Sequence, residues 1–180
     1  MSFIDKPFEI QAPKILMPGL QPAPTIIDVG IMFYDNCAKV AGEEVFVVYF
    51  RSKKVGQNIE ICIISAQGNI SKSTILVSND DPKLHFFKPS LGLGKDSIIV
   101  LWHQSYTGDY RPKDRTLLCC MLFDKKTFKP LIPYPRTLTS TANCMTGVPV
   151  IAHNERYYIV YQEDALDQFK IKLSEIEIGE

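Results

Sequence analysis

Residues that mark metal, redox and nucleic-acid-binding proteins are scarce in this sequence. The 180 residues include only three histidines, and the five cysteines form no Cys-x-x-Cys pair. The sequence therefore supports neither a zinc knuckle nor a dithiol redox motif, and we predict no metal site and no cofactor. Twenty basic residues are balanced by twenty acidic ones. Because nucleic-acid-binding domains usually carry a clear basic excess, no nucleic-acid partner is expected.

Long hydrophobic runs are also missing. The N-terminal stretch MSFIDKPFEIQAP lacks the basic start and the apolar core of a secretion signal. No run approaches the length of about 20 apolar residues that spans a bilayer. With 46% hydrophobic and 22% charged residues, the composition is that of a globular protein. We therefore expect a cytoplasmic protein without a membrane partner, with an extended segment over residues 1–24 and a single domain over residues 25–180.

The most informative feature that is present is a β-rich run ending in an aromatic residue, which occurs three times. The three runs are Val45–Phe50, Ile98–Trp102 and Tyr157–Tyr161. When the runs are aligned, Tyr49, Trp102 and Tyr161 are equivalent and stand 53 and 59 residues apart. Spacing of this kind is typical of repeat architectures. We predict three repeats, which cover about residues 28–82, 83–141 and 142–180.

The runs and their neighbours indicate strands rather than helices. They are short, rich in Val, Ile, Tyr and Phe, and bounded by turn-forming residues. The predicted strands are, in chain order, Val45–Phe50, Ile59–Ser65, Ile70–Val77, Pro89–Leu93, Ile98–Trp102, Thr116–Phe123, Phe128–Leu131, Val148–Ala152, Tyr157–Gln162, Phe169–Ser174 and Glu175–Ile178. Gly68 and Asn69 are expected to supply the positive φ angles of a hairpin turn. No segment predicts a helix, so the expected fold class is all-β.

Two architectures accommodate three four-stranded antiparallel units of this length, namely three β-propeller blades and a β-trefoil. The stretch PSLGLGKDSIIVLWHQ, followed by TLLCCMLFDKKTFKPL, resembles a blade of the sialidase-like and lectin-like propellers. It has a proline-led inner strand, a polar corner, an apolar strand ending in Trp102 and a third strand closing on Phe123 and Asp124. The resemblance implies propeller blades, which we favour over the trefoil. The sialidase Asp-box and an arginine triad are absent, so the resemblance does not imply a glycosidase.

Three blades do not close a propeller ring. An open arrangement leaves unpaired sheet edges, which favour aggregation. We therefore expect a homodimer in which two chains form a six-bladed ring. In this arrangement the proline-rich segment Phe3–Pro24 lies across a sheet edge, and Phe8–Ile10 completes the last blade. The trefoil alternative predicts a monomer instead.

The aromatic residues Tyr49, Trp102 and Tyr161 are the first candidate site. In one interpretation each ring fills the space between neighbouring sheets and buries on the order of 150–250 Å². In the other, the rings stack on the C–H face of a sugar while neighbouring polar side chains bind its hydroxyls. Those polar residues are Arg51, His103, Gln104, Gln162 and Glu163. This second interpretation predicts a non-enzymatic, lectin-like module that binds carbohydrate.

The loop Ser105–Asp114 is a second candidate site because long loops in compact β folds are often functional. It carries Tyr106, Tyr110 and Arg111. Tyrosine and arginine are enriched in the hot spots of protein interfaces. The alternative function is therefore a protein–protein interaction module that binds its partner through this loop.

Loop carboxylates provide a third alternative, a glycoside hydrolase-like enzyme. The candidates are Asp109, Asp114, Glu163, Asp164 and Asp167. A glycosidase uses two carboxylates about 5–10 Å apart. The sequence alone does not place any pair at that distance, and we predict no catalytic residue.

Overall fold

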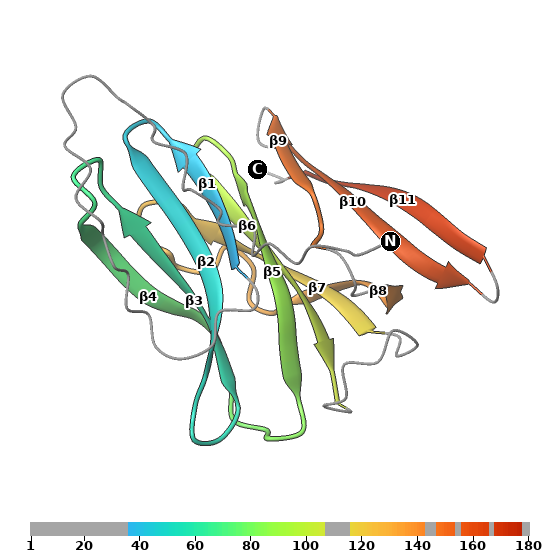
Figure 1. The fold of residues 1–180 in the computed structure, drawn as a ribbon. Helices are drawn as coiled ribbons and strands as arrows, with labels where there is room; N and C mark the ends of the chain where they lie inside the picture. The colour runs from blue at the N-terminus through green and yellow to red at the C-terminus, as the bar shows by residue number, and fades with distance from the viewer. Residues whose placement is uncertain (1–35, 107–115, 143–146, 154–155, 166–167, 178–180) are drawn as a thin grey trace, which may run out of the picture.

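The computed structural model describes residues 36–106, 116–142, 147–153, 156–165 and 168–177, which form eleven β-strands and no helix (Figure 1). The strands are β1 (Asn36–Ala41), β2 (Glu44–Ser52), β3 (Gln57–Ile64), β4 (Ile70–Asn79), β5 (His85–Leu93), β6 (Ser97–Ser105), β7 (Thr116–Asp124), β8 (Arg136–Ala142), β9 (Val150–His153), β10 (Arg156–Ala165) and β11 (Gln168–Glu177). The predicted all-β class is therefore confirmed. The segment 1–24, including Phe8–Ile10, lies outside the described residues.

The strands form two antiparallel sheets. The first sheet has the order β1-β2-β3-β4. The second has the order β11-β10-β8-β7-β6-β5, and β9 also pairs with β10. Strands β8 and β10 are joined through one residue pair, Ala142 opposite Glu163. The strands thus fall into three groups along the chain, which we call the first group (β1–β4), the second group (β5–β8) and the third group (β9–β11).

The second group lies between the other two because its central strands are apolar on both faces. Successive side chains of a strand point to opposite sides of a sheet. In β6, Val100 and Trp102 pack in the core shared with the first group, whereas Ile99 and Leu101 pack in the core shared with the third group. Strand β7 is buried on both faces in the same way, with Cys119, Met121 and Phe123 in the first core and Leu118, Cys120 and Leu122 in the second.

The first strands of the three groups lie near one another in the middle of the molecule (Figure 1). Strand β5 packs against β1, and β9 packs against β5. Gly92 of β5 permits the second of these contacts. A Cβ at this position would stand 2.5 Å from Val150 Cγ1 and 3.0 Å from Tyr157 Cδ1. Only a residue without a side chain lets the second and third groups approach this closely.

Three local predictions were wrong. The expected strand Phe128–Leu131 follows a turn over residues 125–127 and holds one isolated bridge, Phe123 to Pro130, and the fourth strand of the second group is β8. The Asp124 side chain favours this turn because it accepts hydrogen bonds from Thr127 N, Thr127 Oγ1 and Lys126 N.

The other two errors concern a hairpin and the last strand. Of the two residues expected to have positive φ in the hairpin after β3, Gly68 does, at 80°, but Asn69 does not. The expected separate strand Glu175–Ile178 is the end of β11, which runs through Glu177 because β10 pairs with it along its whole length.

Candidate functional site

Two of the predicted ligand-binding residues, Tyr49 and Arg51, meet at Glu60 on one face of the first sheet. Tyr49 lies directly opposite Glu60 in the β2–β3 pair, and its hydroxyl donates a hydrogen bond to Glu60 Oε2 at 3.0 Å. Arg51 Nε lies 3.5 Å from the same oxygen, and Asn58 Nδ2 donates to Glu60 Oε1 at 3.3 Å. Glu60 is only 5% exposed, so these partners compensate the cost of burying a carboxylate.

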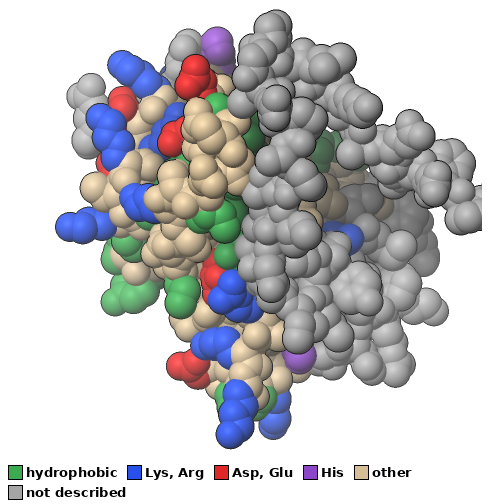
Figure 2. Space-filling view, turned by 60° about the vertical axis from the view of Figure 1, so that its left-hand side comes forward, with side chains coloured by type: hydrophobic (Ala, Val, Ile, Leu, Met, Phe, Trp, Pro, Cys, Tyr) green, Lys and Arg blue, Asp and Glu red, His purple; other side chains and the backbone are tan. Residues whose placement is uncertain are grey.

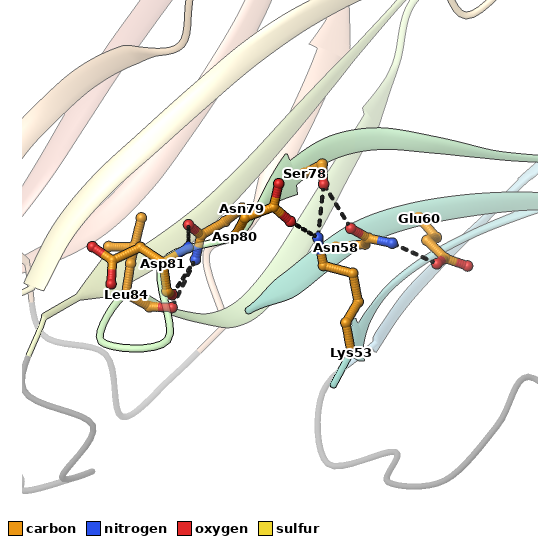
Figure 3. A network of polar contacts seen from close by, with 8 residues as sticks. All are labelled: Lys53, Asn58, Glu60, Ser78, Asn79, Asp80, Asp81 and Leu84. Carbon is orange, nitrogen blue, oxygen red and sulfur yellow. Dashed lines mark hydrogen bonds and ion pairs between the residues drawn. The ribbon is translucent and has the colours of Figure 1, made fainter. Parts of the chain in front are cut away.

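The polar contacts continue from Asn58 to the edge of the sheet (Figure 3). Ser78 Oγ donates to Asn58 Oδ1 at 3.0 Å, and Lys53 Nζ donates to Ser78 Oγ at 3.0 Å and to Asp80 Oδ1 at 2.5 Å. The contacts connect the end of β2 with β3 and β4. Because these polar side chains bind one another, they stabilise this end of the first sheet.

Trp102 lies in the core between the first and second groups. It is 1% exposed, and its ring meets Phe86 edge-on, with the ring centroids 6.0 Å apart and the planes at 67°. Its Nε1 donates to Gln104 Oε1 at 3.2 Å. The Trp102 ring is thus part of the packing between two strand groups, and the Gln104 side chain accepts the hydrogen bond of its indole N–H.

The other predicted residues of the aromatic site lie elsewhere. His103 is buried, with Nδ1 2.9 Å from Thr116 Oγ1. Tyr161 lies in the core between the second and third groups, with its hydroxyl 3.2 Å from Ser174 Oγ. Gln162 is partly exposed, and Glu163 Oε2 lies 3.8 Å from Lys172 Nζ. The three aromatic rings therefore occupy three separate positions and do not line one pocket.

The residues predicted to bind a protein partner are described only in part. Tyr106 is 61% exposed at the start of the 105–114 loop. Tyr110 and Arg111 lie outside the described residues, as do the loop carboxylates Asp109, Asp114 and Asp167, and the side chain of Asp164 is not described either.

The structure also contains a pocket that sequence reasoning missed. It has a volume of about 410 Å³ and opens where β1 and β5 meet the segment that precedes β9. We call it the inner-strand pocket. Its lining residues are Asn36, Cys37, Lys88, Pro89, Ser90, Gly147, Val148 and Pro149. Segments more than 50 residues apart in sequence thus contribute to one site.

The backbone at Lys88 is strained. Its φ is 44°, in the left-handed region that residues other than glycine rarely adopt, although a residue before proline normally adopts extended backbone. The pairing of β5 with β6 shifts register between Phe87 and Ser90, and such bulges change the direction of a side chain. Strain of this kind is concentrated at binding and active sites, where the surrounding structure maintains it.

Ser90 connects the pocket to the third group. It is buried, and its Oγ accepts a hydrogen bond from Val148 N at 3.1 Å. A hydroxyl that accepts in this way retains its own O–H for donation. The signals that could have found the pocket are Lys88-Pro89 and Val148-Pro149. Each dipeptide lies at or just before the inner strand of its group.

A second pocket, of about 460 Å³, is rich in lysine. It is lined by Glu44, Phe46, Ile63, Ser71, Lys72, Lys95, Lys125 and Lys126. Lys125 Nζ donates to Gly94 O at 2.9 Å, and Lys72 Nζ lies 4.2 Å from the centre of the Phe128 ring. Lys125 thus links its own turn to the turn between β5 and β6, and Lys72 of β4 contacts the ring of Phe128. Lysine and arginine side chains lie at both the upper and lower ends of the described face in Figure 2.

Three of the four described thiols, those of Cys62, Cys119 and Cys120, are buried. Cys37, Cys62, Cys119 and Cys120 are free. Burial raises the pKa of Cys120 to about 12, which suppresses the nucleophilic thiolate. Within the described ranges, no three His, Cys, Asp or Glu side chains are arranged to hold a metal ion. Nor does any helix in that part of the chain have the length and apolar character needed to cross a membrane.

Comparison with known proteins assigns no family. No protein-family model matches the chain, and no curated protein matches it significantly in sequence. The functional argument therefore depends on the geometry of the pockets and sheet faces.

Proposed function

We propose that this protein is a non-enzymatic binding module built from three propeller-type blades. Two observations support the proposal. The first and second groups are each four consecutive antiparallel strands, the arrangement of a propeller blade. The first strands β1, β5 and β9 lie next to one another, as inner strands do around a propeller axis. The trefoil is the alternative fold, and the consecutive four-strand order favours blades over it.

The proposed ligand is a carbohydrate in the inner-strand pocket. The observation that carries this proposal is that hydrogen-bonding side chains of the first and second groups meet apolar walls in one pocket. Asn36 brings an amide, Lys88 an ammonium and Ser90 a hydroxyl, while Pro89 and Pro149 provide apolar surface. Concave sites with mainly apolar walls and a few placed polar groups are typical of small-molecule binding. The ligand class agrees with the sequence prediction, but the proposed site is the pocket instead of the aromatic rings.

A glycan array tests the proposed ligand. We expect the labelled full chain to bind one class of sugar reproducibly and the free sugar to compete. Lys88→Ala and Ser90→Ala should each weaken that binding at least tenfold, whereas Lys83→Ala, in the turn between β4 and β5, should leave it unchanged. An array without reproducible binding would reject the carbohydrate proposal, and equal binding by all three variants would reject the inner-strand pocket as the binding site.

A second candidate function is protein–protein interaction through the 105–114 loop. The observation that favours it is the exposure of Tyr106, because a large aromatic side chain at the surface is a typical interface anchor. Replacing Tyr106, Tyr110 and Arg111 with alanine should leave stability unchanged and abolish capture of a partner in pull-downs. Capture of every partner by the triple variant would exclude the loop as the binding site.

We further propose a cytoplasmic location. Four described cysteines are free, including the adjacent pair Cys119 and Cys120. Free thiols persist in reducing compartments, whereas oxidising compartments favour disulfides.

A further inference from the structure

A cluster of lysine side chains lines the second pocket, of about 460 Å³, and we call this site the lysine pocket. Its lysines come from two strand groups: Lys72 from β4, Lys95 from the turn between β5 and β6, and Lys125 and Lys126 from the turn after β7. Glu44 is the acidic residue of the lining. Since the whole chain has a formal net charge of zero, this positive excess is local to the site. A concave surface of one charge sign concentrates ions of the other sign.

Two of the lysines are held in place by the protein itself. Lys125 Nζ donates hydrogen bonds to Gly94 O at 2.9 Å and to Lys95 O at 3.4 Å. Lys72 Nζ donates a hydrogen bond to Lys126 O. The side chains of Lys72 and Lys125 are both partly buried. Because these positions are set before a ligand arrives, binding loses little further side-chain entropy.

These hydrogen bonds leave the positive charges in place. The acceptors are neutral backbone carbonyls, and an ammonium group has three N–H donors, so Lys72 and Lys125 each retain at least one donor for a ligand. In the described part of the chain, no carboxylate forms an ion pair with Lys72, Lys125 or Lys126. The nearby Asp124 instead accepts hydrogen bonds from Thr127 and from the backbone N–H of Lys126.

The charge and the size of the pocket define the ligand. Set against Glu44, the ammonium groups of Lys72, Lys125 and Lys126 leave an excess of two positive charges. This excess matches a phosphate monoester, which carries about 1.5–2 negative charges at pH 7, and lysine is a common phosphate ligand. A volume of 460 Å³ lies within the range of about 300–1,000 Å³ that is typical of pockets for small organic molecules. The site therefore has room for the molecule that carries the phosphate.

The remaining polar groups of the lining favour a ligand with hydroxyls. An ionised carboxylate only accepts hydrogen bonds, so Glu44 suits hydroxyl donors, although it repels a phosphate. Ser71 Oγ donates to Ile63 O at 3.3 Å and can itself accept a hydrogen bond. Phe46 and Ile63 contribute apolar surface to the lining. A phosphate group and several hydroxyls on one small molecule are the chemistry of a sugar phosphate.

We propose that the lysine pocket binds a sugar phosphate. Lys72, Lys125 and Lys126 bind its phosphate group, and Glu44 and Ser71 bind its hydroxyls. The lysine pocket shares no lining residue with the inner-strand pocket. The proposal therefore does not rest on the function proposed above, and either ligand can bind without the other.

Calorimetric titration of the full chain tests this proposal, with glucose 6-phosphate as the probe. We expect one molecule to bind with a dissociation constant below about 1 mM. Inorganic phosphate should bind about tenfold more weakly, because it lacks the hydroxyls that Glu44 and Ser71 bind. Glucose at the same concentration should not displace the probe. Absence of glucose 6-phosphate binding, or equally tight binding of inorganic phosphate, would overturn the proposal.

Single substitutions test which residues bind each part of the ligand. Lys126→Gln removes an exposed ammonium group and should weaken glucose 6-phosphate binding about tenfold, with an unchanged circular dichroism spectrum. Lys54→Gln removes the same charge from the exposed loop between β2 and β3 and should leave the affinity unchanged. Glu44→Ala should strengthen inorganic phosphate binding but weaken glucose 6-phosphate binding. Equal affinities of the two lysine variants would overturn the site, and stronger binding of both ligands to Glu44→Ala would overturn the sugar contact.

One further comparison separates this proposal from the carbohydrate proposal. Lys88→Ala, which alters the inner-strand pocket, should leave glucose 6-phosphate binding unchanged, and Lys126→Gln should leave binding on the glycan array unchanged. Loss of glucose 6-phosphate binding in Lys88→Ala would place the ligand in the inner-strand pocket and overturn the proposal. A blank glycan array with intact glucose 6-phosphate binding would reject the carbohydrate proposal alone.

Discussion

The hydroxyl of Tyr49 donates a hydrogen bond to the buried carboxylate of Glu60, directly opposite it in the neighbouring strand, at 3.0 Å. Arg51 and Asn58 bind the same carboxylate. A buried charge is tolerated only when it is paired and hydrogen-bonded. The pair therefore lies at the centre of a polar network on this sheet face, and it links the conformation of β2 to that of β3.

Removing the Tyr49 hydroxyl should destabilise the fold. Tyr49→Phe leaves Glu60 with Arg51 and Asn58, so we expect a loss near the lower end of about 1.5–3 kcal/mol, the range for a hydrogen bond to a charged group. Urea unfolding followed by circular dichroism measures the change. The exposed Tyr134 provides the control, because Tyr134→Phe should leave the free energy of unfolding unchanged. Equal stability of Tyr49→Phe and the wild type would contradict a stabilising role for this bond.

Alkaline pH should weaken the fold through the same residue. Burial raises the pKa of Tyr49 from its ordinary value of 10 to about 12, and the neighbouring Glu60 carboxylate also favours the neutral phenol. A group whose pKa is higher in the folded state contributes its full stability below its unfolded pKa. That contribution is then lost as pH rises from about 10 through 12. Urea unfolding at pH 9 and pH 11.5 should show a larger loss for the wild type than for Tyr49→Phe. Identical losses would exclude Tyr49 as the cause.

Trp102 should act mainly in packing. Trp102→Ala removes a buried ring between two strand groups, so we expect a loss of about 3–5 kcal/mol in the free energy of unfolding. Thermal unfolding measures it, and Tyr106→Ala, at an exposed position, should change stability by less than about 0.5 kcal/mol. If Trp102→Ala remained as stable as the wild type and lost sugar binding, the ring would instead be part of a ligand site.

The close approach of the second and third groups makes Gly92 sensitive to substitution. The added Cβ of Gly92→Ala would meet Val150, Ile99 and Tyr157 at 2.5–3.0 Å. Overpacking of this kind costs about 1–3 kcal/mol. At Gly147 the nearest atom is Ser90 Oγ at 3.9 Å, so Gly147→Ala should be neutral. Denaturant midpoints of the two variants test this contrast, and equal midpoints would show that the groups can separate without cost.

Local patterns predicted most of the strands. Val45–Phe50 and Thr116–Phe123 were found because β-branched and aromatic residues dominate them, and the structure extends each by no more than two residues at either end. The strand predicted at Phe128–Leu131 failed because the turn that the Asp124 side chain favours ends in Phe128 with a positive φ of 60°, which is incompatible with extended backbone at that residue. That interaction depends on side-chain geometry, which a hydrophobic pattern does not contain.

The candidate sites were harder to predict because they depend on long-range contacts. The sequence identified Tyr49 and Arg51 but not Glu60, which joins them from the next strand. It did not identify the inner-strand pocket, because Asn36, Lys88 and Val148 become neighbours only after all three groups have packed. The strained φ of Lys88 arises from a bulge in the β5–β6 pair, and its local sequence predicts extended backbone instead.

The single residue pair between β8 and β10 has a consequence for how this protein can change in evolution. The three strand groups pack on one another mainly through side chains. A whole group can therefore be duplicated or exchanged without breaking a long ladder of backbone hydrogen bonds. Stability in such chains is approximately a sum over units and over the contacts between neighbours. A tandem duplication of one group would then lengthen the chain by one unit and join that unit to its neighbour through the same kind of side-chain contact.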